Sequence, residues 1–407
     1  MNKHFNFIIS IFSIFFLISI CSNANTLSVS YDESRTFKSI SQNDSISNCL
    51  DNFIVTLDGE TISVTPNMIS LNTSKLGEQI VTVTYAGQTA TTSAIICTPS
   101  KYFTINSTEP KIISKYTGSA PTVIVPKYIN YHEITTLGTS AFAENKTLTS
   151  IIANNITAIN DNAFFWCNLT FVDFPKATSI GDRAFYTCPL VSINFPNVAS
   201  IGKEAFDSCE NLVSVDFPKV NSIDDETFSY CDSLTNISFP NVTSIGDEAF
   251  YSCINLVSVD FPKVDSIGLE AFSCCDSLTN ISFPNATYID LGAFSYCISL
   301  ISANFPKVTT IEGSAFYYCK LLTNVFFPLA NSIGDIAFGD CFNLTNVTLG
   351  QVPTAFDDKV FSLNYLVPSP KNLIIKVPKG TYDKYRNLFK KNENTFYLRD
   401  SFAIVEY

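Results

Sequence analysis

The chain has 407 residues, of which 46% are hydrophobic and 13% aromatic, so it can bury a large core in two or three folded units. Lys and Arg total 25 against 37 Asp and Glu, which gives a formal charge of −12. Because an acidic surface repels phosphate backbones, this balance argues against nucleic acid as a partner.

The first 24 residues have the pattern of a signal peptide. Lys3 supplies a positive charge, residues 7–20 form an apolar run, and small residues lead to Ala24, after which we expect cleavage. The alternative is a retained membrane anchor, although the apolar run is short for a span. No second run of spanning length follows. We therefore expect an extracellular protein, secreted or at the cell surface, with no integral membrane span in the mature chain.

Residues 27–99 predict a small all-β sandwich. Apolar and polar residues alternate in 53–57 and 80–85, and turn pairs such as Asp58-Gly59 separate these runs. The stretch 72–88 resembles the bacterial immunoglobulin-like domains of surface proteins. This resemblance implies an Ig-like domain ahead of the rest of the chain.

Two cysteines, Cys49 and Cys97, are the only ones in this domain. An exported protein meets an oxidising environment, which permits a disulfide between them. Two separate buried thiols are the alternative interpretation.

Residues 102–137 are predicted to be the N-terminal cap of a repeat array. The run 123–126 imitates a repeat strand that ends in Pro, but the period is not yet regular. Atypical terminal repeats are expected, because an end coil has one face without a neighbour.

Residues 138–349 repeat one pattern every 21–22 residues. The Phe of an Ala-Phe-x-x-Cys unit recurs at 142, 164, 185, 206, 228, 250, 272, 294, 316 and 338, and a Phe-Pro pair begins at 174, 195, 217, 239, 261, 283, 305 and 327. A fixed period with apolar anchors predicts a solenoid of about ten to twelve coils, in which no coil buries its face alone.

The repeated unit resembles a known family. Ile-Gly-x-x-Ala-Phe-x-x-Cys, together with the spacing of Leu212, Val215 and Phe217, resembles the BspA-type leucine-rich repeats of bacterial and protist surface proteins. The resemblance implies an α/β-type leucine-rich repeat solenoid with a parallel β-sheet on one face, and it implies adhesion as the function.

Residues 350–407 are predicted to hold a degenerate last repeat and the C-terminal cap. A strand ending in Pro at 372–378 precedes the helical spacing of Tyr382, Tyr385 and Phe389, and 396–398 resembles a closing strand. This strand-Pro-helix order also resembles the end of the family's solenoids.

One cysteine per coil forms a regular series. Tetrahedral zinc sites use pairs two to four residues apart, whereas these thiols are a whole coil apart. Free Cys is among the most buried residue types, so we predict a reduced, structural column and no metal or other cofactor. Its members are Cys167, Cys188, Cys209, Cys231, Cys253, Cys275, Cys297, Cys319 and Cys341, with Cys274 as an extra.

Catalytic groups are scarce. After removal of the signal peptide His132 is the one remaining histidine, so a Ser-His-Asp or Cys-His arrangement would have to be built around it. An ordinary surface histidine is the alternative that we favour, and we expect the protein not to be an enzyme.

The outward positions of the repeat strands are the candidate binding surface. They form a polar, mildly acidic plane with aromatic residues near both ends, and exposed aromatic residues carry much of the energy of an interface. The alternative is that repetition merely duplicated a soluble face. Twelve Asn-x-Ser/Thr sequons occur, and sugars at two of them (236 and 280) would cover this plane. The candidate contact residues are Phe171, Asp173, Asp216, Asn236, Asp260, Asn280, Asn304 and Phe326.

These patterns lead to two hypotheses about function. The first is an exported, non-enzymatic adhesin that binds an extracellular or host macromolecule, protein or glycan, through the solenoid. The alternative is a structural, self-assembling component of a surface layer without a heterologous ligand. The ligand and the oligomeric state are not indicated by the sequence.

Overall fold

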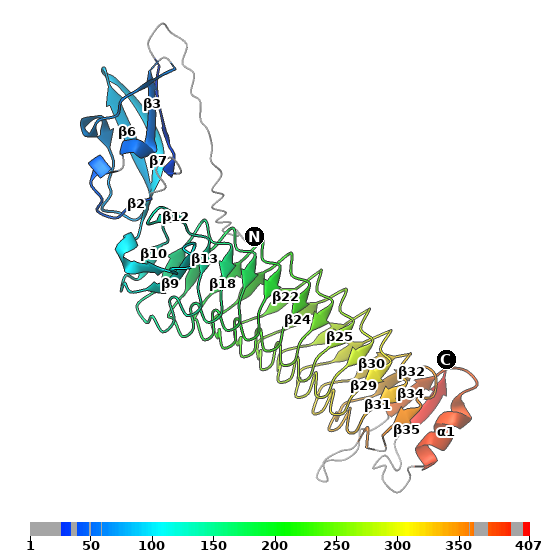
Figure 1. The fold of residues 1–407 in the computed structure, drawn as a ribbon. Coiled ribbons are helices and arrows are strands. Elements are labelled where there is room, and N and C mark those ends of the chain that lie inside the picture. Colours follow the sequence, from blue (N-terminus) through cyan, green and yellow to red (C-terminus); the bar gives the residue numbers. More distant parts are fainter. Residues whose placement is uncertain are drawn as a thin grey trace.

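The computed structural model describes residues 26–33, 39–48, 50–57, 59–357, 359–361, 373–391 and 402–407. The predicted signal peptide, Cys49 and the predicted closing strand at 396–398 lie outside these residues. The molecule is elongated: a small β unit stands at one end of a long stack of coils, and a helix lies at the other end (Figure 1).

The N-terminal unit consists of two small sheets around a core of their own. Val55, Val81, Val83 and Ile96 are fully buried between them. One sheet has the order β1-β3-β4 and the other β2-β7-β6-β5. Their strands are β1 (Leu27–Tyr31), β2 (Ile40–Ser41), β3 (Phe53–Leu57), β4 (Glu60–Ile62), β5 (Ile69–Ser70), β6 (Gly77–Tyr85) and β7 (Gln88–Cys97), with 3-10 turns η2 (Ile46–Asn48), η3 (Leu50–Asn52), η4 (Pro66–Met68) and η5 (Ser100–Tyr102).

Hydrogen bonds join this unit to the first coils. The amide of Thr98 donates to the carbonyl of Ile124 (2.9 Å), whose own amide donates to Thr98 Oγ1 (2.9 Å). The predicted cap therefore covers the start of the stack while its strands already pair with the repeats. These strands are β8 (Phe103–Ile105), β9 (Ile112–Tyr116), β10 (Thr122–Ile124), β11 (Tyr128–Ile129) and β12 (His132–Glu133).

Each repeat adds one coil, and the predicted solenoid is confirmed. A strand of three to five residues from each coil forms what we call the strand face, with inward side chains such as Ile237 alternating with outward ones. The strand face comprises β10, β14 (Ser150–Ile152), β16 (Phe171–Asp173), β18 (Ser192–Asn194), β20 (Ser214–Asp216), β22 (Asn236–Ser238), β24 (Ser258–Asp260), β26 (Asn280–Ser282), β28 (Ser302–Asn304), β30 (Asn324–Phe327), β32 (Asn346–Leu349) and β34 (Leu373–Val377).

A second parallel ladder runs along another side of the coils. Ten of its eleven two-residue strands bury an apolar side chain, which is Ile in nine of them, and the ladder is interrupted once, between β19 and β21. The strands are β13 (Thr136–Leu137), β15 (Ala158–Ile159), β17 (Ser179–Ile180), β19 (Ser200–Ile201), β21 (Ser222–Ile223), β23 (Ser244–Ile245), β25 (Ser266–Ile267), β27 (Tyr288–Ile289), β29 (Thr310–Ile311), β31 (Ser332–Ile333) and β33 (Ala355–Phe356).

The third side, which we call the turn face, corrects the expected α/β type. In the coil of residues 204–208, Glu204 and Ser208 have φ angles of 53° and 57°, and other coils repeat this pair of left-handed residues. An α-helix needs consecutive right-handed residues, so two left-handed ones so close together exclude it. Within the described repeats, the coils form a parallel β-solenoid without α-helices.

Backbone hydrogen bonds also connect neighbouring coils on the turn face. The amides of Glu204, Phe206 and Ser208 donate to the carbonyls of the next coil at 3.0, 3.0 and 2.8 Å. The same three bonds recur at every coil boundary from Ser140 to Gly339.

The interior is a continuous stack of two Phe columns. Along the column next to the turn face, ring centroids of successive coils are 5.1 to 5.7 Å apart, as in Phe250–Phe272 (5.1 Å, 8° between planes). All of these rings are buried in one cluster that spans the whole solenoid. Offset stacking of this kind adds to the energy of apolar burial.

The column next to the strand face is spaced unevenly. Where the strands pair, at β18–β20 and β22–β24, the ring centroids are 5.6 and 5.7 Å apart. The centroids are farther apart at three other boundaries: 6.3 Å at β16/β18, 6.5 Å at β20/β22 and 6.0 Å at β24/β26. At these last three boundaries the strands do not pair. The coils that carry β18, β20, β22 and β24 are therefore grouped in two pairs on this face.

The C-terminal end closes the stack. β35 (Phe402–Glu406) adds to β34, and α1 (Tyr382–Lys391) confirms the predicted helix. Tyr385 of α1 is fully buried and donates its hydroxyl to the carbonyl of Gln351 (2.8 Å). None of the helices in the described part of the chain has the length and apolar character that a membrane span requires.

Candidate functional site

The strand face carries the predicted contact residues on its outward positions. Asp216, Asn236, Asp260, Asn280 and Asn304 are exposed. The rings of Phe171 and Phe326 are 48% and 40% exposed. Asp173 is half-buried, and burial raises the pKa of its carboxyl. The face therefore combines polar side chains with two isolated aromatic rings.

Some of these residues are brought together by the stacking. Ser258 donates to Asn236 Oδ1 (2.5 Å) and Ser238 donates to Asp260 Oδ2 (3.0 Å). Further along, Ser302 donates to Asn280 (2.6 Å) and Asn304 donates to Ser282 (3.1 Å). Each of these side-chain bonds crosses a boundary at which the strands are paired.

The two aromatic rings do not come together. Phe171 lies on β16 and Phe326 on β30, with six strands of the face between them. At about 4.8 Å per strand, seven steps separate the rings by about 34 Å. One small ligand cannot touch both rings, whereas a macromolecule lying along the solenoid can.

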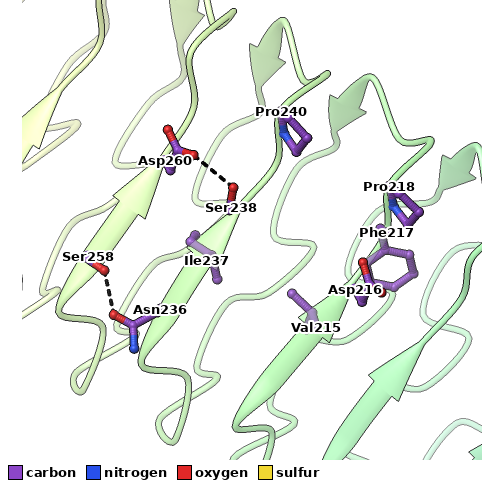
Figure 2. A pocket seen from close by; sticks show the side chains of 10 residues that line it. All are labelled: Val215, Asp216, Phe217, Pro218, Asn236, Ile237, Ser238, Pro240, Ser258 and Asp260. Carbon is purple, nitrogen blue, oxygen red and sulfur yellow. Dashed lines mark hydrogen bonds between the residues drawn. The ribbon is translucent and has the colours of Figure 1, made fainter. Parts of the chain in front are cut away.

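An open hollow of about 560 Å³ lies where β20 and β22 separate (Figure 2). Val215 and Ile237 contribute apolar surface, and the carboxylates of Asp216 and Asp260 add negative charge. Among the described residues no hydrogen bond from the Phe217 amide reaches the next coil, whereas the equivalent amide of Phe239 donates to the backbone carbonyl of Asp260 (3.1 Å). The hollow thus offers acceptors and a free backbone donor to a polar ligand group.

The nine cysteines of the predicted column are buried and free. Each thiol donates to a Phe carbonyl of the preceding coil, for example Cys253 Sγ to Phe228 O (3.2 Å). Burial raises the pKa of Cys253 to about 12 and that of Cys167 to about 11. Protonated thiols that donate to the backbone are poor nucleophiles and poor metal ligands.

The remaining sequence candidates lie elsewhere. Cys97 is buried at the end of β7 and is not bonded to any described cysteine. Its predicted partner Cys49 lies outside the described residues, so the pairing stays a prediction. His132 is exposed on β12.

The turn face holds aromatic residues that the sequence analysis did not single out. The only Trp of the chain, Trp166, is 47% exposed and stacks on Phe165 (5.6 Å, 6°), with Lys146 Nζ 5.4 Å from the indole centroid. Near the other end of the solenoid, the ring centroids of Tyr296 and Tyr318 are 5.2 Å apart. The sequence could have indicated this aromatic surface, because these rings occupy the two variable positions of Ala-Phe-x-x-Cys.

Comparison with protein families gives one match. A family model described as "BspA type Leucine rich repeat region (6 copies)" matches residues 135–257 and 243–367, which is more than half of the chain. No curated protein matches the chain.

Several solved structures are similar to it. A leucine-rich repeat protein from Bacteroides ovatus shares 21% identity over 75% of this chain and 98% of its own, with a TM-score of 0.45. A leucine-rich cell surface protein from Faecalibacterium prausnitzii shares 20% over 80% and 94%, with a TM-score of 0.42. The pneumococcal vaccine antigen PcpA shares 14% over 82% and 98%, with a TM-score of 0.43.

Proposed function

The chain belongs to the BspA-type leucine-rich repeat family, and we propose that it is an exported, non-enzymatic adhesin that binds an extracellular or host macromolecule through its strand face. One observation carries the proposal: polar side chains and two rings are exposed along the parallel strands of one continuous surface. Extended solenoid surfaces of this kind suit macromolecular ligands, protein or glycan.

Two further features support the proposal. The signal-peptide pattern of residues 1–24 favours export to the cell surface or the medium. The single histidine of the mature sequence, His132, is exposed, and the thiols of the cysteine column are buried in the core, which favours a binding protein over a hydrolase.

We also propose that residues 27–99 are an Ig-like domain that acts as a spacer. Two sheets that pack around a shared core, as β1-β3-β4 and β2-β7-β6-β5 do, agree with a sandwich of this type. The hydrogen bonds between Thr98 and Ile124 would hold such a spacer at the first coil.

Binding of the purified mature chain to immobilised extracellular matrix proteins tests the function. We expect Phe171→Ser and Phe326→Ser each to weaken binding by tenfold or more, because exposed aromatic residues are frequent hot spots. Trp166→Ser is the matched control, since it removes an equally exposed ring from the turn face. Loss of binding in the control alone would move the contact surface to the turn face, and no binding to any matrix protein would contradict the proposal for this ligand class.

Self-assembly into a surface layer is the second candidate. Among the described strands β35 is the last of its sheet, and Val405 on it is 46% exposed. An exposed edge strand can pair with a strand of another chain. Concentration-dependent association in sedimentation experiments, abolished by Val405→Lys, would favour this function over adhesion.

A further inference from the structure

Three boundaries of the strand face are open, and they recur at every second coil. The strands do not pair at β16/β18, β20/β22 and β24/β26. The coil before each open boundary carries the sequence Val-Asp-Phe-Pro-Lys, at 172–176, 215–219 and 259–263. At about 4.8 Å per coil, neighbouring openings are about 10 Å apart. The strand face therefore repeats one kind of opening at a regular spacing.

Each opening has an unused backbone donor. Where neighbouring coils pair, the Phe amide after the strand donates to the next coil, as that of Phe195 does to the Asp216 carbonyl (3.0 Å). At the open boundaries this amide donates to no residue in the described part of the chain, and the three amides are those of Phe174, Phe217 and Phe261. Because the coils repeat one geometry, these N–H groups are directed into the openings.

An acceptor and an apolar side chain lie beside the donor of the middle opening. Val215, Asp216 and Phe217 all line the hollow there (Figure 2). Val215 is half-buried, whereas Ile237, the inward residue of the next strand, is 4% exposed. The Asp216 carboxylate accepts no hydrogen bond from a described residue, so a donor, an acceptor and an apolar surface adjoin one space.

The two outer openings contain the same residue types. Val172 and Val259 are half-buried like Val215. The Asp173 carboxylate accepts no hydrogen bond from the described residues, and that of Asp260 accepts one, from Ser238 (3.0 Å). The three openings are therefore chemically equivalent, and a ligand that fits one of them fits all three.

An acetamido group matches these three features. It has one N–H donor for the Asp carboxylate, one carbonyl acceptor for the Phe amide, and a methyl group for the Val side chain. An ammonium group has donors but no acceptor, and a sugar hydroxyl has no apolar part. The openings thus suit an N-acetylated amino sugar better than a cationic side chain or an unmodified sugar.

The spacing of the openings indicates a chain of such sugars. In an extended chitin-type polysaccharide each sugar is turned over relative to the one before it. Acetamido groups on one side of the chain therefore recur once per disaccharide, a repeat close in length to two coils. Such a chain lying along the strand face can place one acetamido group at each opening.

We propose that the strand face binds a linear, chitin-type polysaccharide, with one acetamido group in each opening beside Asp173, Asp216 and Asp260. This inference rests on the proposed adhesive function, because it names the ligand class of the same surface. Phe171, which is 48% exposed on the same strand as Asp173, can pack against a sugar ring at the first opening.

Calorimetric titration of the mature chain with fully acetylated chitohexaose tests the inference. We expect the disaccharide chitobiose to bind at least about tenfold more weakly than the hexamer, because it reaches one opening and not three. Cellohexaose has the same backbone without acetamido groups, and it should also bind at least about tenfold more weakly, since it lacks the paired donor and acceptor.

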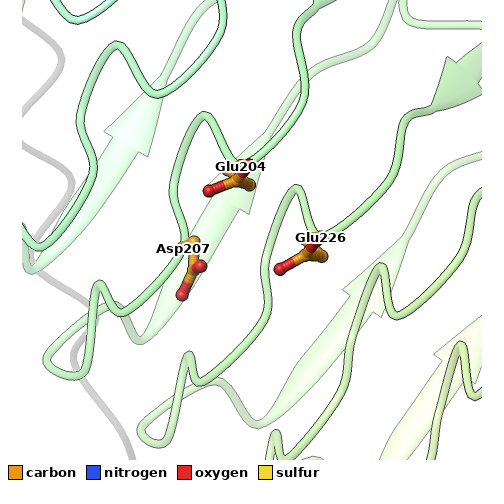
Figure 3. Close-up of side chains that lie close together, drawn as sticks. All are labelled: Glu204, Asp207 and Glu226. Carbon is orange, nitrogen blue, oxygen red and sulfur yellow. The ribbon is translucent and has the colours of Figure 1, made fainter.

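The deacetylated hexamer separates recognition of the acetyl group from attraction of a cation. Carboxylates also gather elsewhere, as Glu204, Asp207 and Glu226 do on the turn face (Figure 3). Such clusters attract a polycation whether or not it carries acetyl groups. We expect the deacetylated hexamer to bind more weakly than chitohexaose in physiological salt, and tighter binding of the cationic hexamer would overturn the proposal.

Two variants locate the contact. Asp216→Ala removes the acceptor of the middle opening and should weaken chitohexaose binding about tenfold. Asp335→Ala is the matched control, because it removes an exposed carboxylate beside β31 and should leave the affinity unchanged within about twofold. Chitohexaose should also slow hydrogen exchange of the Phe217 amide in the wild type, since that amide gains an acceptor.

Three results would overturn the proposal: no binding of chitohexaose, equal binding of cellohexaose, or equal losses in Asp216→Ala and Asp335→Ala. Binding of matrix proteins by the same preparation keeps this test apart from that of the proposed function. A chain that binds matrix proteins but not chitohexaose remains an adhesin, and this ligand is then wrong. A chain that binds chitohexaose but no matrix protein supports the polysaccharide as its ligand.

Discussion

The strand face and the turn face are built from the same repeats but are held together differently. On the turn face, three backbone hydrogen bonds join each coil to the next without interruption from Ser140 to Gly339. On the strand face, three boundaries between β16 and β26 are unpaired, and the rings beneath them are farther apart. The turn face therefore maintains the stack, and the strand face can lose pairing at single boundaries without breaking it.

The largest expected effect comes from removing a ring near the turn face. Phe250 lies 5.5 and 5.1 Å from the rings on either side, whereas Phe217 near the strand face is 5.6 Å from one neighbour and 6.5 Å from the other. Phe250→Ala should cost about 3–5 kcal/mol of unfolding free energy in urea titrations, and Phe217→Ala should fall at or below the low end of that range. Equal losses of unfolding free energy in the two variants would contradict an energetic difference between the turn face and the strand face.

The reactivity of the buried thiols shows how readily the interior next to the turn face opens to solvent. Because burial raises the pKa of Cys253 to about 12, its thiolate at pH 8 should be about a thousandfold scarcer than for an ordinary thiol. Peptide mapping after labelling of the native chain should show rapid modification of the half-buried Cys274 and modification of Cys253 only after unfolding. Fast labelling of native Cys253 would show that the column opens.

Hydrogen exchange tests the unpaired boundaries directly. The amides of Phe239 and Phe283 donate across the boundary to the next coil (3.1 Å each), while among the described residues those of Phe217 and Phe261 do not. We expect the second pair to exchange about tenfold faster, because local opening need not break a bond there. Residue-resolved exchange by NMR is the measurement, and equal protection would mean that the boundaries are closed in solution.

A substitution at one of the left-handed residues of the turn face should have the smallest effect. Thr187 is β-branched and has a φ of 56°, a conformation that costs such residues about 1–2 kcal/mol and that Asn adopts more easily. Thr187→Asn should therefore stabilise the chain by about 1 kcal/mol in thermal or urea unfolding. Thr170→Asn is the control, since Thr170 lacks a positive φ and should gain nothing.

Much of the fold is predictable from the sequence, because in a solenoid the spacing of residues along the chain determines where they lie in the coil. Once coils of 21–22 residues stack in parallel, residues one period apart are neighbours. The period therefore predicts the columns that contain Phe250 and Cys253, and it predicts that Asp216 and Asn236 point outward. The helix Tyr382–Lys391 follows from its apolar spacing in the same way.

What the sequence did not indicate is the shape of the backbone between those anchors. Glu204 and Ser208 are not residues that favour a positive φ, and the fold places them there because the turn must fit between buried Phe206 and the next coil. The unpaired boundary at β20/β22 likewise depends on the summed packing of two coils.

The period, the buried columns and the outward plane can be read from the residues alone, because these features depend only on which side chains are apolar and how far apart they stand. The three sides of the coil, and the approach of Asp207 to Glu226 across a coil boundary, exist only in the folded solenoid. The physical reason is that the left-handed turns are not favoured by their own residues: they are stabilised by hydrogen bonds to the next coil, which exist only after the coils have stacked.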